Sequence, residues 1–197
     1  MEAVTPIVLA GGRGTRLGGV NKALLEIGGR RVIDRLLDAL RPLATDEIVV
    51  VNNDGSLVGL PGTRVVPDVD PGGGALVGLY SGLRAVRTPL ATVTACDMPF
   101  VSTPLLRRLL ALAADYDAVV PVLAEQPEPL HAVYRRACLP AIEAALAAGR
   151  KRVIAFFDRV RVRYVGEAEL RAWDPDLRSF LNVNRPEDLA EAERLAR

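Results

Sequence analysis

Cysteine is scarce in this chain. Only Cys96 and Cys138 occur among 197 residues, far apart and without CxxC spacing. This pattern argues against a disulfide framework or a thiolate zinc site, and it is typical of a protein of the reducing cytosol. We therefore expect both thiols to be small core side chains.

Net charge and long apolar runs are also absent. The 25 basic and 24 acidic residues leave a formal charge of +1, so no global field draws the chain to nucleic acid or to an anionic membrane. No apolar run reaches the roughly 18 residues of a membrane span, and the N-terminal stretch is too short for the apolar region of a signal peptide. We expect a cytoplasmic protein that binds anions only locally.

Internal repeats and low-complexity tracts are missing as well, so we expect a single domain over residues 1–197. The chain instead alternates apolar β-rich runs with amphipathic stretches. Strands are predicted at residues 6–10, 47–52, 63–67, 91–96, 118–123 and 161–165. Helices are predicted at residues 32–43, 75–86, 103–114, 139–149 and 186–197. This alternation predicts a three-layer α/β/α fold with a mostly parallel sheet, whose ligands lie over the carboxyl ends of the strands.

A glycine-rich loop follows the first predicted strand. Gly11, Gly12 and Gly14 have no Cβ, so their N–H groups can wrap phosphate oxygens. The spacing fits neither known nucleotide loop, because Leu17 stands where G-x-G-x-x-G needs its last glycine and the Walker A ending GK[ST] is absent. A phosphate-binding loop and a plain glycine-rich turn are the two interpretations.

Three cations belong to this loop. Arg13 and Arg16 can grip phosphate oxygens as a fork, while Lys22 offers a compact charge able to follow a migrating phosphoryl group. Each of them could equally be a solvated surface residue. Lys22 is the better candidate, because the apolar stretch after it indicates ordered structure.

Two further stretches place polar side chains at predicted strand ends. Asp97 follows the strand at 91–96, and one carboxylate plus substrate phosphates is the usual way to hold Mg²⁺; the alternative is an acid in a turn. Asn182 and Asn184 alternate along an extended segment and so share a face, where they could bind a metal, a phosphate or a ribose. Asn184 could instead cap the helix after it.

Five stretches together resemble molybdenum cofactor guanylyltransferase, a family of the nucleotidyltransferase superfamily with a Rossmann-like α/β fold. They are VLAGGRGTRLGGVNKALLEIGG, VVPDVDPGGGALVGL, TACDMPF, EPLHAVYRRACLPAIEAAL and FLNVNRPEDL, and they span almost the whole chain in the family's order. The resemblance implies transfer of GMP from Mg-GTP to the terminal phosphate of molybdenum-molybdopterin, with release of pyrophosphate. The choice of guanine is inherited from this resemblance, in which LAGG favours GTP over CTP.

The resemblance also implies roles for particular residues. Nucleotide-binding positions correspond to Leu9, Ala10, Gly11, Gly12, Asn52 and Asp68. Lys22 corresponds to the phosphate-binding lysine, and Asp97 corresponds to the magnesium ligand that also contacts the nucleotide. From its charge and its place in the loop, rather than from the resemblance, Arg16 is expected to be a second catalytic cation. Asn182 or Asn184 would face the metal or the second substrate. Asp68 could accept from guanine, or could with Asp70 merely shape a turn.

Other positions depart from the family or stay open. The family usually has Asp where this chain has Asn21, and Ala75 and Val77 replace a proline and an alanine near the expected base pocket. The basic residues 149–153 could meet a phosphorylated acceptor or form a solvated helix end. His131 is expected to be structural or to touch substrate, since an acceptor phosphate is already anionic and needs no general base.

Three functional hypotheses follow: the guanylyltransferase, another small-substrate nucleotidyltransferase of the cytidylyl or sugar-1-phosphate type, and a non-catalytic GTP-binding protein. The expected cofactor is Mg²⁺. The expected partners are GTP and molybdenum-molybdopterin, with room for transient contact with other molybdenum-cofactor proteins. We expect a monomer that binds neither nucleic acid nor membrane.

Overall fold

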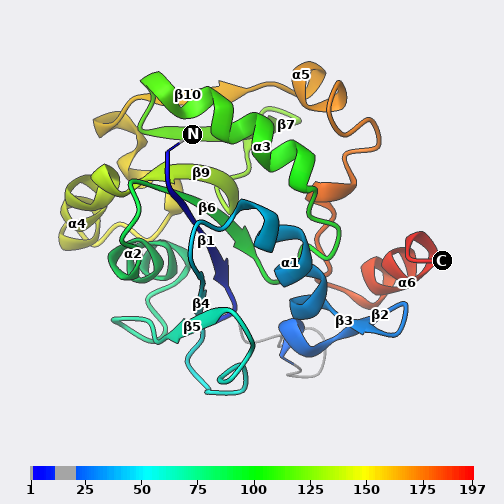
Figure 1. Cartoon of the computed structure of the whole chain (residues 1–197). Helices are drawn as coiled ribbons and strands as arrows, with labels where there is room; N and C mark the ends of the chain where they lie inside the picture. The colour runs from blue at the N-terminus through cyan, green and yellow to red at the C-terminus, as the bar shows by residue number, and fades with distance from the viewer. Residues whose placement is uncertain (1, 12–20) are drawn as a thin grey trace.

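The computed structural model describes residues 2–11 and 21–197, and its centre is a mostly parallel β-sheet (Figure 1). The strands are β1 (Val4–Leu9), β4 (Ile48–Val51), β5 (Thr63–Val66), β6 (Leu90–Ala95), β7 (Ala118–Leu123), β9 (His131–Arg135) and β10 (Val162–Val165), with the short β8 (Gln126–Pro127) beside β7. Their order across the sheet is β10-β7-β9-β6-β1-β4-β5. Strand β9 runs antiparallel to its neighbours β6 and β7, and the short β8 runs antiparallel to β7, while the other strand pairs described for this sheet are parallel. A separate antiparallel pair joins β2 (Glu26–Ile27) to β3 (Arg30–Arg31).

Helices cover both faces of this sheet, so the predicted α/β architecture is confirmed. They are α1 (Val32–Leu40), α2 (Ala75–Ala85), α3 (Thr103–Ala111), α4 (Leu139–Ala147), α5 (Glu167–Arg171) and α6 (Pro186–Leu195). Helices α2 and α4 pack on one face, and α1, α3, α5 and α6 contribute to the core on the other (Figure 1). None of the helices in the described part of the chain is both long and apolar enough to cross a membrane.

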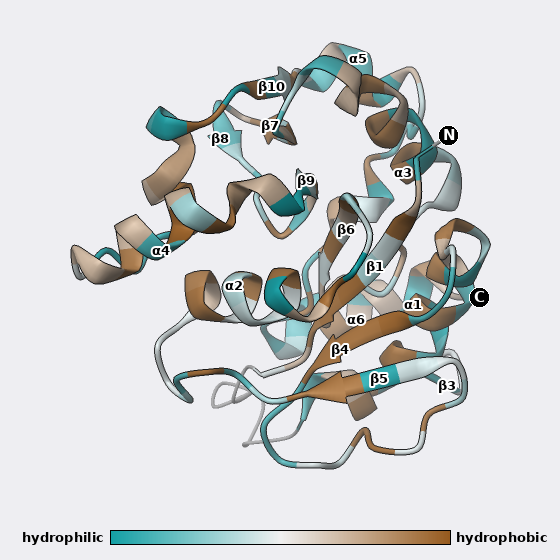
Figure 2. Cartoon of the chain, turned by 60° about the vertical axis from the view of Figure 1, so that its left-hand side comes forward, coloured by the Kyte–Doolittle hydropathy of each residue, from teal (hydrophilic) through white to brown (hydrophobic). Residues whose placement is uncertain are grey.

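The apolar strands explain why the sheet is covered twice. Along β4, Ile48 and Val50 join one core cluster while Val49 and Val51 join the other, because successive side chains of a strand point to opposite faces. Figure 2 shows β4 and most of β1 in the colours of strongly hydrophobic residues. Continuous apolar runs in the sequence therefore become strands buried on both faces.

The carboxyl ends of β1, β4, β5 and β6 lie at one edge of the sheet. Backbone hydrogen bonds continue past the regular strands, from Ala10 N to Val51 O at 2.8 Å, from Asn52 N to Val66 O at 2.9 Å, and from Cys96 N to Leu9 O at 3.0 Å. These bonds hold the first residues after each strand in register. Side chains just beyond these strands are thereby fixed beside one another.

Candidate functional site

Lys22 and Asp97 meet at this edge of the sheet. Lys22 starts a short 3₁₀ turn, Lys22–Leu24, and its Nζ lies 3.1 Å from Asp97 Oδ2. Nζ also donates a hydrogen bond to Asn184 Oδ1. The two charged side chains are only 15% and 21% exposed, so their attraction is stronger than that of a surface pair.

The segment around Asn182 and Asn184 is tied to the same place. The backbone N–H of Val183 donates to the carbonyl of Asp97 at 2.8 Å, which brings both asparagines beside β6. The segment is extended but forms no regular strand, and Asn182 Nδ2 donates to Phe180 O at 3.3 Å. Sequence residues 85 positions apart thus share one site.

The capping alternative for Asn184 is wrong. Arg185 precedes the first turn of α6, and the Asp188 carboxylate accepts from the backbone N–H groups of Asn184 and Arg185 at 2.9 and 2.8 Å. The side chain of Asn184 is therefore left to accept from Lys22.

On the other side of Asp97, the ends of β4 and β5 carry polar groups. Asn53 Nδ2 donates to Asp68 Oδ2 at 2.9 Å, and Asp68 N donates back to Asn53 Oδ1 at 2.8 Å. Gly11 lies against this pair, since a Cβ there would be 3.3 Å from Asp68 Oδ2. Asn52 is 4% exposed and donates to Ala10 O at 3.2 Å.

Leu9 and Ala10 use their backbone groups inside the protein. Leu9 O accepts from Cys96 N, Ala10 N donates to Val51 O, and Ala10 O accepts from Asn52. These two residues position the edge, and Gly11 is the described backbone next in line toward the glycine-rich loop. Gly12, Arg13, Gly14 and Arg16 lie outside the described residues.

Three oxygens at this edge are buried without a hydrogen-bond donor among the described residues. They are Asn52 Oδ1, Asp68 Oδ1 and Asp97 Oδ1, which follow β4, β5 and β6. Because buried polar atoms are normally paired, unpaired oxygens along one edge indicate a place where a ligand supplies donors or a cation.

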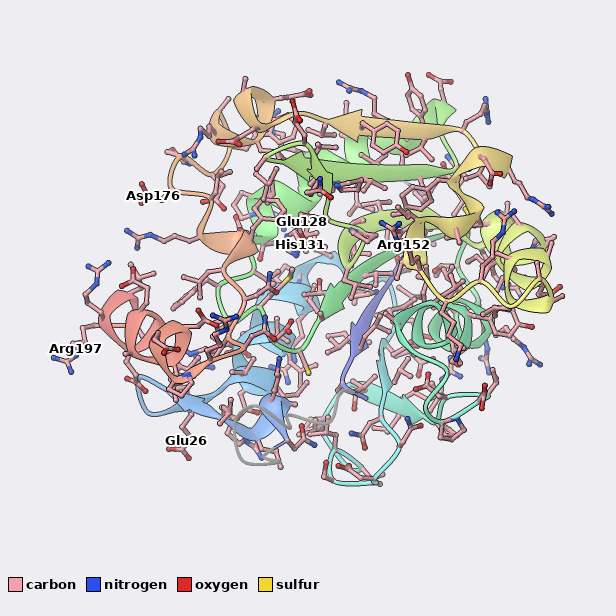
Figure 3. All side chains as sticks on the ribbon, turned by 180° about the vertical axis from the view of Figure 1, so that it is seen from behind. Glu26, Glu128, His131, Arg152, Asp176 and Arg197 are labelled. Carbon is pink, nitrogen blue, oxygen red and sulfur yellow. The ribbon has the colours of Figure 1, made fainter. Side chains whose placement is uncertain are left out.

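A cavity of about 450 Å³ opens beside Asp97. Asp97, Asn182 and Asn184 line it, while Asn52 and Asp68 do not. Its other lining residues include Glu128, which follows β8, and Lys151 and Arg152, which follow α4; Figure 3 labels Glu128 and Arg152. Asp97 therefore lies between the ends of β4 and β5 on one side and this cavity on the other.

Comparison with known proteins identifies the family of this chain. The pattern of the MobA-like NTP transferase domain matches residues 6–162. A molybdenum cofactor guanylyltransferase from Desulfosudis oleivorans is 40% identical over 194 residues, covering 98% of this chain and 96% of that protein. A probable molybdenum cofactor guanylyltransferase from Pelotomaculum thermopropionicum is also 40% identical, covering 100% and 95%.

The chain belongs to the MobA-like NTP transferase family. Its structure resembles that of molybdopterin-guanine dinucleotide biosynthesis protein A from Archaeoglobus fulgidus, with a TM-score of 0.84 and 30% identity over 97% of each chain. The resemblance read from the sequence is confirmed, and the protein is a nucleotidyltransferase.

The donor set at Asp97 fits a hard divalent cation. Carboxylate and amide oxygens are the ligands that Mg²⁺ accepts, usually few in number and completed by water and phosphate. Asp97 Oδ1 is unpartnered among the described residues, and Asn182 and Asn184 bring amide oxygens to the same cavity wall. Across residues 2–11 and 21–197, no cluster of three or more His, Cys, Asp or Glu forms a complete protein cage.

Asn21 supports the lysine of this transferase. Its Oδ1 accepts from Ala23 N at 3.0 Å and caps the turn that begins at Lys22. Its Nδ2 donates to Ser56 Oγ at 2.8 Å and to Asp54 Oδ2 at 3.3 Å. The amide therefore makes a bond to Asp54 that a carboxylate at this position could not make.

The other two departures have different surroundings. Ala75 begins α2 and lines the cavity. Val77 is 5% exposed, and a Cβ added at Gly73 would lie 2.4 Å from Val77 Cγ2. Val77 thus occupies space that is open because residue 73 is glycine.

The histidine and the cysteines are buried. His131 packs edge-on against Phe180, with ring centroids 5.0 Å apart, and burial lowers its pKa to about 4. A neutral imidazole at physiological pH fits the structural alternative for this residue. Cys96 and Cys138 lie in the two core clusters, as expected, and burial raises the pKa of each thiol to about 12.

Sequence reasoning missed Glu128 and Asn53. Glu128 lies in a stretch that carried the family resemblance, but it received no role because its strand context was not predicted. A polar residue shortly after the predicted strand 118–123 was the available signal.

Proposed function

We propose that this nucleotidyltransferase transfers GMP from GTP to the terminal phosphate of molybdenum-molybdopterin and releases pyrophosphate, with Mg²⁺ as its cofactor. The observation that carries the proposal is the position of Asp97, which is paired with Lys22 and lies between two polar half-sites. A group-transfer enzyme needs such a junction, because donor and acceptor must meet in one place.

The donor nucleotide is assigned to the edge formed by Gly11, Asn52 and Asp68. The oxygens Asn52 Oδ1 and Asp68 Oδ1 lack donors within the described chain, and a guanine N–H, its amino group or a ribose hydroxyl would supply them. The absence of a Cβ at Gly11 leaves room for close approach to the Asp68 side chain.

The triphosphate is assigned to Lys22 and the glycine-rich loop before it. Lys22 Nζ is held at Asp97 Oδ2, where it balances the carboxylate, and its compact ammonium can move to a phosphate when the nucleotide arrives. Asp97, with Asn182 or Asn184, would hold the divalent ion, which supplies positive charge that stabilises the phosphoryl oxygens in the transition state.

The reaction itself requires no protein base. An oxygen of the acceptor phosphate forms a bond to the α-phosphorus of GTP, and the bond from that phosphorus to the bridging oxygen breaks to release pyrophosphate. The protein contributes alignment and charge neutralisation. Lys151 and Arg152, on the cavity wall, supply positive charge for the acceptor phosphate.

The test is pyrophosphate release by the purified protein with GTP, Mg²⁺ and molybdenum-molybdopterin, run beside CTP as the competing nucleotide. We expect release with GTP and little with CTP. Release with CTP alone would assign the protein to the cytidylyl type, and GTP binding without turnover would make it a binding protein. We also propose a cytoplasmic location.

A further inference from the structure

Glu128 has a fixed position on the wall of the cavity. It lies between β8 and β9, where its backbone N–H donates to Pro121 O at 2.8 Å and its carbonyl accepts from His131 N at 3.2 Å. Both bonds tie the residue to the neighbouring strands, so its side chain starts from a rigid backbone. Figure 3 labels Glu128, His131 and Arg152 near the centre of that view.

The carboxylate of Glu128 has no basic partner within 4.0 Å among the described residues, although the chain is rich in arginine. Glu2, Glu47 and Glu169, by contrast, each pair with an arginine at 2.7 to 2.9 Å. Glu128 is half-buried, and burial, followed by the charge of Asp97, raises its pKa above the ordinary value for a glutamate.

This environment costs free energy in the absence of a ligand. A partly desolvated carboxylate that shares a cavity with another carboxylate is stabilised when hydrogen-bond donors enter that cavity. The negative and positive side chains of the cavity wall come from different parts of the chain. Glu128 follows β8, and the cations Lys151 and Arg152 follow α4. A ligand that fits must therefore bring donors to one part of the cavity and an anion to another.

We infer that Glu128 selects the acceptor by accepting hydrogen bonds from the adjacent ring N–H and amino group of its heterocycle. This inference rests on the proposed function, in which the acceptor is a phosphorylated pterin. A pterin carries such a donor pair, and a carboxylate accepts both hydrogens side by side. The cavity volume of about 450 Å³ suits a ligand of this size.

The first test measures binding without nucleotide. The probes are 6-hydroxymethylpterin and the matching lumazine, in which a carbonyl replaces the 2-amino group. The wild-type protein should bind the pterin more tightly, and Glu128→Gln should lose roughly tenfold or more in pterin affinity while changing little toward lumazine. Equal binding of the two probes by the wild type, or binding of neither, would overturn the inference.

The matched control is Glu125→Gln. Glu125 lies three residues away in the same connection, is exposed, and does not line the cavity. The Glu125→Gln variant removes the same charge from the same connection, so we expect it to discriminate between the pterin and the lumazine as the wild type does. Thermal unfolding of Glu128→Gln should occur at or slightly above the wild-type temperature, because the change removes a partly desolvated charge, and Glu128→Ala provides a second variant that removes the acceptor oxygens altogether.

The second test is transfer by the complete system. Glu128→Gln should raise the KM for molybdenum-molybdopterin about tenfold and leave the KM for GTP unchanged. If instead the Mg²⁺ requirement rises with the acceptor KM unchanged, Glu128 is a metal ligand and the inference is wrong. If the wild-type protein transfers no GMP at all, the proposed function fails, whereas transfer that ignores the Glu128 change defeats this inference alone.

Discussion

At Asp97, the two oxygens of one carboxylate have different surroundings. Oδ2 pairs with Lys22 at 3.1 Å, and Oδ1 is buried without a donor among the described residues. A protonated amine can balance the charge of the group but leaves the second oxygen available. The residue is thus arranged to exchange or share its cation when nucleotide and metal bind.

Replacing that charge tests its assigned role. Asp97→Asn keeps the shape of the side chain but removes the carboxylate, so turnover with GTP and acceptor should fall by about 100-fold or more. The measurement is pyrophosphate release across a Mg²⁺ titration, with circular dichroism to check the fold. Asp176→Asn changes an exposed carboxylate that pairs with Arg178 and does not line the cavity, so it serves as control; Figure 3 labels Asp176. Unchanged turnover in Asp97→Asn would refute the metal assignment.

Asn21 offers a second test at this scale. Asn21→Asp places a carboxylate beside Asp54 Oδ2, now 3.3 Å from the amide nitrogen, so repulsion should loosen the turn that carries Lys22. Because the pair is exposed, we expect a rise of about two- to fivefold in the KM for GTP. Combining it with Asp54→Asn should restore most of the loss. A double variant as weak as the single one would show that the contact with Asp54 is unimportant.

The proximity of Lys22 and Asp97 could be predicted from the sequence, because each follows one of two strands, β1 and β6, that are parallel neighbours. The carboxyl ends of parallel strands lie at the same edge of a sheet. The role of Asn21 could not be predicted the same way. Its partners Asp54 and Ser56 are 33 and 35 residues away, in a loop without a recognisable pattern. Contacts between loops depend on three-dimensional placement that periodicity does not encode.

At the scale of elements, helix α2 packs against strand β1 through a glycine. Gly82 faces Ile7, and a Cβ added at Gly82 would lie 2.7 Å from Ile7 Cγ2. Ile7 is fully buried, so it has little space to move away. The glycine permits the close contact that brings the start of α2 to the edge of the sheet.

A pair of glycine variants tests this packing. Gly82→Ala should lower the free energy of unfolding by about 1–3 kcal/mol, because overpacking outweighs the gain of about 1 kcal/mol in helix propensity. Gly78→Ala lies on the same helix, where a Cβ would meet only ordinary contacts at 3.6 Å or more, and it should be neutral or stabilising. Urea unfolding of both variants is the measurement. Equal effects would remove the packing argument.

Strand β9 is an element that the sequence patterns did not predict. Six strands and five helices were expected at nearly their observed positions, but β9, the two-residue strands β2, β3 and β8, and the short helix α5 were not. The run HAVYR is only five residues long, begins with histidine and ends with arginine, so it lacks the long apolar signal of its neighbours. Its antiparallel place between β6 and β7 is set by pairing partners that lie elsewhere in the chain.

At the scale of the whole molecule, the sheet separates two apolar clusters, and the C-terminal segment closes one of them. Phe180 and Val183 join the cluster that also contains α1 and α3 residues. The same segment carries Asn182 and Asn184 to Asp97. Assembly of the site therefore depends on docking of the last part of the chain against the sheet.

His131 lies at this docking surface and makes its stability depend on pH. Its pKa is about 4 when folded, against 6.5 as the ordinary value, because burial opposes the charged ring. Above pH 6.5 the ring is neutral in both states; as pH falls below 6.5 the unfolded chain binds a proton that the folded chain refuses, so unfolding becomes easier until about pH 4. The difference between these two pKa values corresponds to a loss of roughly 3 kcal/mol across that window.

Replacing the ring isolates this contribution from that of the carboxylates. His131→Phe keeps the contact with Phe180 but cannot take up a proton, so its free energy of unfolding should change much less than that of the wild type between pH 6.5 and 5. Glu2, Asp54 and Glu191, whose pKa values are lowered, lose their contribution only nearer pH 4, which is why the upper part of the window is diagnostic. Urea unfolding at several pH values gives the two curves. Parallel curves would mean that His131 does not stay neutral in the folded protein, and that the protonated ring finds a hydrogen-bond acceptor or a negative charge when the pH falls.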